Sequence, residues 1–281
     1  MTQKIKIVSD SSSDVMELDG VDFASAPLKI ITSNKEYVDD ENLNVEEMVD
    51  DLRVYKGKSS TSCPNSEDWI QAFGDAEQVF CVTITGTLSG SYNAACVAKE
   101  MYEEKYPNRK VCVINSLSAG PEVKLIIEKI QELILEEKTF DEICTLITKH
   151  MEDTGLLFML ESMRNLANNG RVSPLVAKIA GFLGIRVVGK ASSKGDLQPL
   201  DKCRGEKKAL DAIISHLKEL GSKLKKIRIV HCFNEGAALS LKERILKEFE
   251  KVKVEIYKCR GLCSFYAEKG GLLVGYEKAK A

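Results

Sequence analysis

The sequence predicts an α/β protein of two domains: an N-terminal doubly wound, mostly parallel sheet and a C-terminal mixed α+β domain. The first half passes repeatedly from a short apolar strand through a turn into a helix, the pattern of a parallel sheet covered by helices. The second half contains a strand–turn–strand pattern typical of a hairpin. The length of 281 residues suits one large or two medium domains. We therefore expect domains at 1–153 and 154–281.

The elements of the first domain follow from apolar runs and from the polar residues that cap helices. We expect strands at 4–8, 22–26, 28–32, 35–37, 79–82 and 110–114. We expect helices at 45–55, 67–73, 122–135 and 140–151, with one more that ends near residue 102. Asn44, Ser66 and Thr139 are the expected N-caps of three of these helices, because their side-chain oxygens can accept from free backbone N–H groups.

The second domain mixes short helices with strands that pair with their neighbours along the chain. We expect strands at 155–160, 184–189, 196–203, 227–231, 252–258 and 272–276. We expect helices at 164–167, 205–220 and 235–250, and one that opens after Pro174 and ends near residue 183. The turn Ser192–Gly195 joins the two strands of the predicted hairpin.

Composition excludes several classes of protein. The net charge of −2, from 40 basic and 42 acidic residues, and an aromatic content of 6% argue against nucleic-acid binding. The sequence shows no signal peptide and no stretch near the roughly 20 apolar residues of a membrane span, which predicts a cytoplasmic protein. Nine scattered cysteines indicate reduced thiols, and three histidines argue against a histidine-based metal site.

The candidate site lies where hydroxyl-rich turns follow strands. Residues 82–95 pass from an apolar strand through a turn of Thr, Ser and Gly into a helix, and residues 9–14 and 58–66 are similar turns. The free N–H groups at the start of a helix attract anions, and glycines allow a ligand to approach the backbone. A well-capped turn without a ligand is the alternative interpretation.

Three kinds of chemistry are compatible with these turns. Residues 86–90 read G-x-x-S-G, one residue away from the G-x-S-x-G of a nucleophile elbow, so an acyl hydrolase would use Ser89 with His231. The sequence contains neither G-x-x-x-x-G-K-[ST] nor G-x-G-x-x-G, so nucleotide binding has little support. Anion binding has the most donors: Thr61, Ser62, Thr85 and Ser89 with Arg171 and Arg204.

Five motifs in order resemble the DegV family of bacterial fatty-acid-binding proteins. The resemblance runs from the N-terminus to about residue 260. The motifs are Ser9-Asp10-Ser11-Ser12-Ser13-Asp14, Thr61-Ser62-Cys63-Pro64, Thr85-Gly86-Thr87-Leu88-Ser89-Gly90-Ser91-Tyr92, Asn169-Gly170-Arg171-Val172-Ser173 and Asp201-Lys202-Cys203-Arg204-Gly205-Glu206-Lys207-Lys208-Ala209.

The resemblance implies a long-chain fatty acid in a tunnel between and under the two domains. It implies that Thr61 and Ser89 hold the carboxylate and that Arg171 and Arg204 lie near this end of the tunnel. It also implies a non-catalytic subunit with no cofactor or metal. Such a subunit presents its fatty acid to a separate ATP-dependent fatty acid kinase, which makes acyl phosphate for phospholipid synthesis.

Two positions depart from the family pattern. Cys63 stands where many relatives have Gln, and Tyr266 falls about where many have His. A tyrosine can donate a hydrogen bond but lacks the charge that a histidine can carry. The expected ligand-binding residues are Thr61, Ser62, Thr85, Gly86, Ser89, Arg171, Arg204 and Tyr266.

Overall fold

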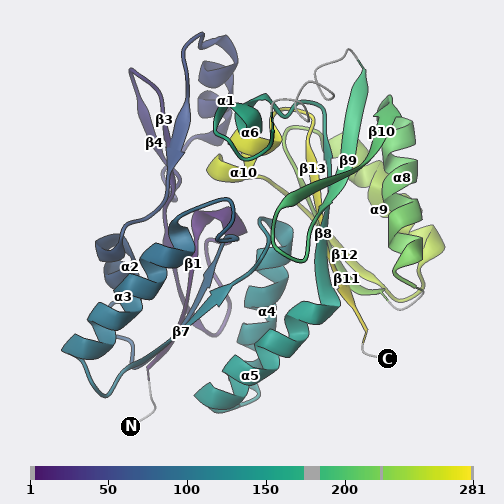
Figure 1. Cartoon of the computed structure of the whole chain (residues 1–281). Helices are drawn as coiled ribbons and strands as arrows, with labels where there is room; N and C mark the ends of the chain where they lie inside the picture. Colours follow the sequence, from purple (N-terminus) through teal and green to yellow (C-terminus); the bar gives the residue numbers. More distant parts are fainter. Residues whose placement is uncertain (1–3, 174–183, 222–223, 280–281) are drawn as a thin grey trace.

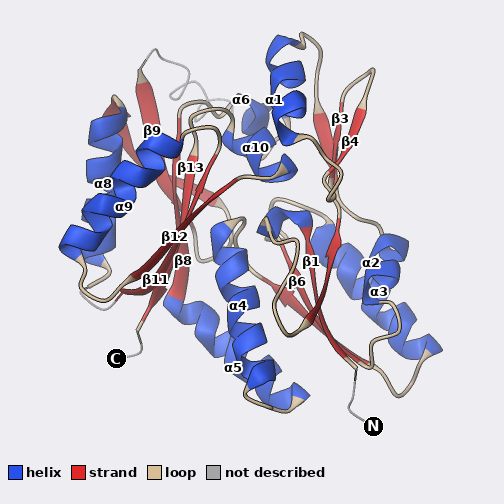
Figure 2. Ribbon diagram, turned by 180° about the vertical axis from the view of Figure 1, so that it is seen from behind, coloured by secondary structure: helices blue, strands red, loops and turns tan. Residues whose placement is uncertain are grey.

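A computed structural model describes residues 4–173, 184–221 and 224–279 (Figure 1). The helix expected from Pro174 to residue 183 lies outside the described residues. These residues form three sheets with helices packed between and around them (Figures 1 and 2). Among the described helices, none combines the length and the apolar character that crossing a membrane requires.

The first sheet is parallel and is covered by helices on both faces, as predicted. Its order is β2 (Asp22–Ala26), β1 (Ile5–Asp10), β6 (Gln78–Thr83) and β7 (Lys110–Asn115). The covering helices are α2 (Ser66–Phe73), α3 (Ser91–Lys105), α4 (Pro121–Leu135) and α5 (Phe140–His150). Successive side chains of a strand point to opposite faces, so Val79 and Cys81 pack in one core with α2 and α3, whereas Phe80 and Val82 pack in another with α4 and α5.

The second sheet is mixed, with six strands. In order they are β10 (Leu197–Arg204), β9 (Ile185–Ala191), β8 (Thr154–Leu160), β13 (Leu272–Lys278), β11 (Leu224–His231) and β12 (Lys253–Lys258). β11 and β12 are parallel, and the other neighbouring pairs are antiparallel. The expected hairpin is formed by β9 and β10.

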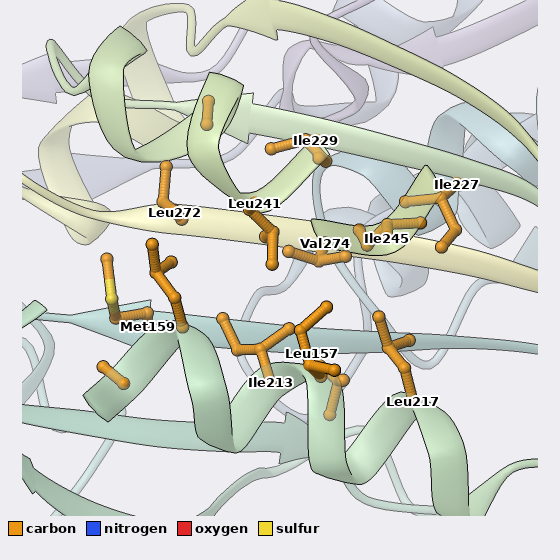
Figure 3. Packing of buried hydrophobic residues seen from close by; sticks show 14 of the residues in the cluster. Leu157, Met159, Ile213, Leu217, Ile227, Ile229, Leu241, Ile245, Leu272 and Val274 are labelled. Carbon is orange, nitrogen blue, oxygen red and sulfur yellow. The ribbon is translucent and has the colours of Figure 1, made fainter. Parts of the chain in front are cut away.

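One face of this mixed sheet packs against α8 (Glu206–Glu219) and α9 (Glu235–Glu248). Figure 3 shows the side chains that interlock in this core: Leu157, Met159, Ile213, Leu217, Ile227, Ile229, Leu241, Ile245, Leu272 and Val274. On β8, the residues between these core positions point to the opposite face, toward the first half of the chain.

The third sheet contains a strand that we did not predict from the sequence. β3 (Lys29–Ile31) pairs with β4 (Glu36–Val38) on one side and with β5 (Ser60–Ser62) on the other. We expected residues 58–66 to form a loop, which was wrong for β5. Three residues of Ser and Thr carry no apolar signal, and only pairing with β3 makes them a strand.

The expected caps are confirmed for two helices and wrong for the third. Asn44 caps α1 (Val45–Val54) and Thr139 caps α5. Ser66 is the first residue of α2 and not its cap. Asn65 Oδ1 instead accepts from the N–H groups of Glu67 and Asp68 at 2.8 and 3.0 Å. Because Asn65 stands one residue earlier, its side chain can reach N–H groups that have no partner inside the helix.

A short helix absent from our predictions, α10 (Gly261–Ala267), connects the end of the chain to its first half. The carboxylate of Asp39 accepts from the N–H groups of Gly261 and Leu262, each at 2.8 Å. Phe265 then packs in a core with Ile30 and Met48.

The domain boundary that we expected falls between a 3₁₀ turn (Met151–Asp153) and β8, and the division into domains stays a prediction.

Candidate functional site

A largely apolar pocket opens between the first half of the chain and the inner face of the mixed sheet. It holds about 700 Å³ of empty space, counting the space open to solvent at its mouth. Its apolar lining consists of Leu28, Ile84, Leu88, Ala119, Leu156, Phe158, Leu160, Leu166, Leu197, Leu262, Cys263, Ala267 and Leu273. These residues come from both sides of residue 153.

Strand β8 supplies one long wall of the pocket. Leu156, Phe158 and Leu160 line the pocket, whereas Leu157 and Met159 lie in the core on the other face of the sheet. Four residues of strand extend for about 13 Å, so the lining follows a long path. The pocket therefore suits an elongated apolar group.

Four polar residues complete the described lining: Thr61, Ser89, Arg171 and Tyr266. They lie together. Thr61 Oγ1 and Tyr266 Oη are 2.7 Å apart. Arg171 Nε donates to the carbonyl oxygen of Leu88 at 3.1 Å, which places the guanidinium beside Ser89. The pocket therefore has a polar end and a long apolar remainder.

This polar end has donors left over for a ligand. Thr61 and Tyr266 share one hydrogen bond, so one of their two hydroxyl hydrogens stays available. Ser89 Oγ accepts from the N–H of Ser91 at 3.3 Å, and its own hydrogen has no acceptor within the described residues. Burial raises the pKa of Tyr266, against the opposing effects of Thr61 and Arg171, which keeps the phenol protonated at neutral pH. The arrangement suits an anion.

Asp10 holds the turn that carries Ser89. Its buried carboxylate accepts from the N–H of Ile84 at 2.9 Å and from the hydroxyl of Ser91 at 2.6 Å. Burial raises the pKa of Asp10, and the hydrogen bonds from Ser12, Ser91 and Ile84 oppose that shift. The hydroxyl-rich motif at the end of β1 thus supports the candidate site without lining it.

The other four expected residues lie outside the described lining of the pocket. Ser62 follows Thr61 in β5, so its side chain points to the opposite face of the strand. Thr85 Oγ1 lies 3.0 Å from Thr87 Oγ1, against the hairpin turn at Gly195. Gly86 is exposed and donates its N–H to Asn115 Oδ1 at 3.1 Å. Arg204 is exposed at the end of β10.

The structure does not bring His231 to Ser89. On β11, His231 stands opposite Leu272, which belongs to the core covered by α8 and α9. Residues directly opposite each other in a ladder share a face, so His231 lies on the far side of the sheet from the pocket. Its Nδ1 accepts from the N–H of Asn234 at 3.3 Å, and burial lowers its pKa. No observation within the described residues therefore favours the hydrolase.

Sequence reasoning overlooked the apolar lining and the supporting role of Asp10. A signal for the lining exists on β8, where leucines and a phenylalanine occupy every position from 156 to 160 except Met159. Such a continuous apolar run indicates a strand buried on both faces.

Within the described residues, no group of three or more His, Cys, Asp and Glu side chains is placed to hold a metal ion.

Comparison with known proteins gives a consistent family. A family model described as an uncharacterised protein of the DegV family matches residues 4–279. A DegV domain-containing protein of Streptococcus pneumoniae is 42% identical over 276 residues, covering 97% of this chain and 98% of the relative.

Solved structures of DegV proteins share the fold. A DegV family protein from Eubacterium eligens loaded with heptadecanoic acid is 43% identical, with a TM-score of 0.96 over 98% of this chain and 100% of that one. The Fatty Acid Kinase (Fak) B3 protein of S. pneumoniae, loaded with linoleic acid, is 42% identical, with a TM-score of 0.96 over 99% and 100%. A DegV protein of Ruminococcus gnavus with vaccenic acid is 29% identical, with a TM-score of 0.89 over 97% and 99%.

Proposed function

The chain belongs to the DegV family, and we propose that it binds a long-chain fatty acid and presents it to a partner fatty acid kinase. In this role the chain has no catalytic activity of its own and needs no cofactor. The kinase transfers phosphate from ATP to the bound carboxylate, and the acyl phosphate enters phospholipid synthesis. We expect this phosphate transfer to take place in the cytoplasm.

The observation that carries the proposal is the division of one pocket into a polar end and a long apolar part. Thirteen of its described lining residues are apolar, and the four polar ones gather around Thr61. Burying a methylene group gains about 0.8 kcal/mol, so a long acyl chain gains about 10 kcal/mol before the cost of ordering it. A fatty acid is the ligand class with this division of charge and length.

The polar end supplies what the carboxylate needs. Removing an unpaired carboxylate from water costs several kcal/mol. Hydroxyl donors from Thr61 or Tyr266 and from Ser89 offset this cost, and the guanidinium of Arg171 adds charge-assisted bonding. These four residues are our proposed ligands for the carboxylate.

Lipid extraction followed by mass spectrometry tests the binding function. The protein purified from a bacterial host should carry a fatty acid in about equimolar amount, and the delipidated protein should take up palmitate or oleate. The Thr61→Ala, Ser89→Ala double variant should bind palmitate more weakly than the wild type, with coupled effects because both residues serve one carboxylate. A ligand-free protein that takes up neither fatty acid would refute the proposal.

The partner is tested separately with the catalytic subunit of the S. pneumoniae fatty acid kinase. The palmitate-loaded chain should support ATP-dependent acyl phosphate formation by that subunit, and the chain alone should not form it. Acyl phosphate formed by the chain with ATP and no kinase would contradict a non-catalytic role.

A further inference from the structure

A second hollow, lined by basic side chains, lies beside the polar end of the pocket. Arg53, Lys56, Lys58 and Arg164 line it, and no Asp or Glu lines it among the described residues. We call the hollow that these four residues line the basic hollow. It encloses about 1000 Å³, counting the space open to solvent.

The basic hollow and the polar end of the pocket lie on two sides of one wall. Ser59 lines the hollow, whereas Thr61, two residues further along the chain, lines the pocket. On α6 (Arg164–Asn168), Asn165 lines the hollow and Leu166 lines the pocket. Hydrogen bonds join the parts of the wall, and α1, α6 and α10 lie close together in both views (Figures 1 and 2).

α10 completes this wall. The side-chain amide of Asn165 donates to the carbonyl oxygen of Phe265 at 2.9 Å, directly before Tyr266. Asn169 Nδ2 donates to the carbonyl oxygen of Ser59 at 3.3 Å. A protein that reached the carboxylate from this side would therefore cover the basic hollow as well.

The cations of the hollow are largely unpaired within the described residues; a carboxylate beside it is that of Glu268, which accepts from the N–H of Asn165 at 3.1 Å and lines an adjoining hollow with Arg53 and Arg164. Lys56, Lys58 and Arg164 form no ion pair within the described residues, and Arg53 has only Asp50, at 3.9 Å on the exposed surface. Exposed ion pairs of this kind contribute little to stability. The chain as a whole carries a net charge of −2, so four cations without a lining acid are a local concentration of charge.

We propose that the basic hollow docks an acidic surface of the kinase that phosphorylates the bound carboxylate. The inference rests on the proposed function. The transferring kinase must approach the carboxylate, and complementary charge beside that point would steer its approach. The fit is to a protein surface and not to a small phosphate: α1 ends at Val54, so its carbonyl end faces this region, and the cations are long and exposed.

Charge reversal tests the docking surface. Association of the palmitate-loaded chain with the catalytic subunit of the S. pneumoniae fatty acid kinase is measured by surface plasmon resonance at 50 and 300 mM NaCl. The wild-type association rate should fall about tenfold between these salt concentrations. The Lys56→Glu, Lys58→Glu, Arg164→Glu variant should associate at least tenfold more slowly at 50 mM, with a weaker dependence on salt.

A matched variant separates this surface from charge in general. Lys247→Glu, Lys251→Glu, Lys253→Glu makes the same change of charge on exposed residues after and within α9 and at the start of β12, and it should associate within threefold of the wild type. Lys→Gln and Arg→Gln changes at the three positions of the hollow should give an intermediate loss. Thermal midpoints of all variants check that they are folded.

Palmitate uptake distinguishes failure of this inference from failure of the proposed function. If the wild type takes up no palmitate, the proposed function fails. If uptake is normal and the reversed variant associates as the wild type does, the docking surface is refuted. The docking surface is also refuted if the loaded wild type does not associate with the kinase subunit. It is refuted as well if the chain binds ATP directly and the charge-reversed variant does not, because the hollow would then be a phosphate site.

Discussion

The hydroxyl groups of Thr61 and Tyr266 lie 2.7 Å apart, although 205 positions separate the two residues in the sequence. Thr61 is held by the pairing of β5 with β3, and Tyr266 is held by α10, whose first N–H groups are bound by Asp39. The polar end of the pocket therefore depends on the return of the chain's last helix to its first half.

Removing either hydroxyl of this pair should weaken binding of the carboxylate. Thr61→Val and Tyr266→Phe nearly keep the shape of the side chain and remove one donor each. We expect each to lower the affinity for palmitate about tenfold, equivalent to about 1.4 kcal/mol, as measured by isothermal titration calorimetry. Each single variant already breaks the hydrogen bond that orients the remaining hydroxyl, so the double variant should lose less than the sum. Ser62→Ala is the control, and an equal loss in that variant would count against the assignment.

Substitutions of Arg171 and Arg204 should have very different effects on palmitate binding, although both residues were expected near the carboxylate. Arg171 lines the pocket, whereas Arg204 is exposed outside it. Arg171→Gln should weaken palmitate binding about 10- to 100-fold, the size of a lost hydrogen bond to a charged group. Arg204→Gln should stay within threefold.

Hexadecanol provides the control ligand for this comparison, because it has the same chain length and no charge. The loss in Arg171→Gln should largely disappear with hexadecanol. An equal loss for both ligands would mean that Arg171 acts through the position of Leu88, whose carbonyl oxygen it binds, and not through charge.

The sequence predicted the strands and helices of the parallel sheet because their apolar runs are long and their turns are polar. The same reasoning could not separate Thr61 from Ser62, or Arg171 from Arg204. Which side chain lines the pocket depends on the phase of a three-residue strand and on the place where a loop packs. Those relations arise from contacts between distant segments, and no local pattern records them.

α10 was missed for a related reason. Its sequence, Gly261–Ala267, is rich in small and aromatic residues with modest helix propensity. It begins where Asp39, more than 200 positions earlier, accepts from its free N–H groups, and it is stabilised by the core around Phe265. Tyr266 could be assigned to the candidate site only through the family resemblance.

A larger side chain at Leu156 should shorten the acyl chain that binds. Leu156 lies about 13 Å along β8 from Leu160, away from the polar end, where α6 follows Leu160. Leu156→Phe should displace about two methylene groups of a long ligand, which corresponds to about 1.6 kcal/mol. Stearate should therefore lose about tenfold in affinity, and laurate should lose little, in competition binding.

The neighbouring position provides the control for chain length. Leu157 faces the core with α8 and α9, so Leu157→Met should leave the ratio of stearate to laurate affinity unchanged. If Leu156→Phe lowers both affinities equally, the pocket does not end near this residue.

The stability of the delipidated protein should fall as pH rises from about 4.5 to about 7. Glu122, at the start of α4, is 6% exposed. Burial raises its pKa from the ordinary 4.5 to about 7, against a hydrogen bond from Thr154 Oγ1. An acid with a raised pKa binds its proton more tightly in the folded state. Stability is therefore greatest below the unfolded pKa, declines between the two values and is constant above the folded pKa.

Glu122→Gln should remove this decline, because glutamine stays neutral and its carbonyl oxygen can still accept from Thr154. The free energy of unfolding, measured by urea denaturation, should be higher in the variant than in the wild type at pH 8, by up to about 3 kcal/mol. Burial also raises the pKa of Asp14 to about 7 and raises the pKa values of Asp10 and Asp39, so part of the slope should remain in this variant and should become smaller when Asp14→Asn is added. Exposed Glu142 has the opposite sign: its hydrogen bonds from Thr139 lower its pKa, and Glu142→Gln should reduce stability at pH 8. A Glu122→Gln protein that is less stable than the wild type at pH 8 would show that the buried carboxylate is compensated and that its charge does not oppose folding.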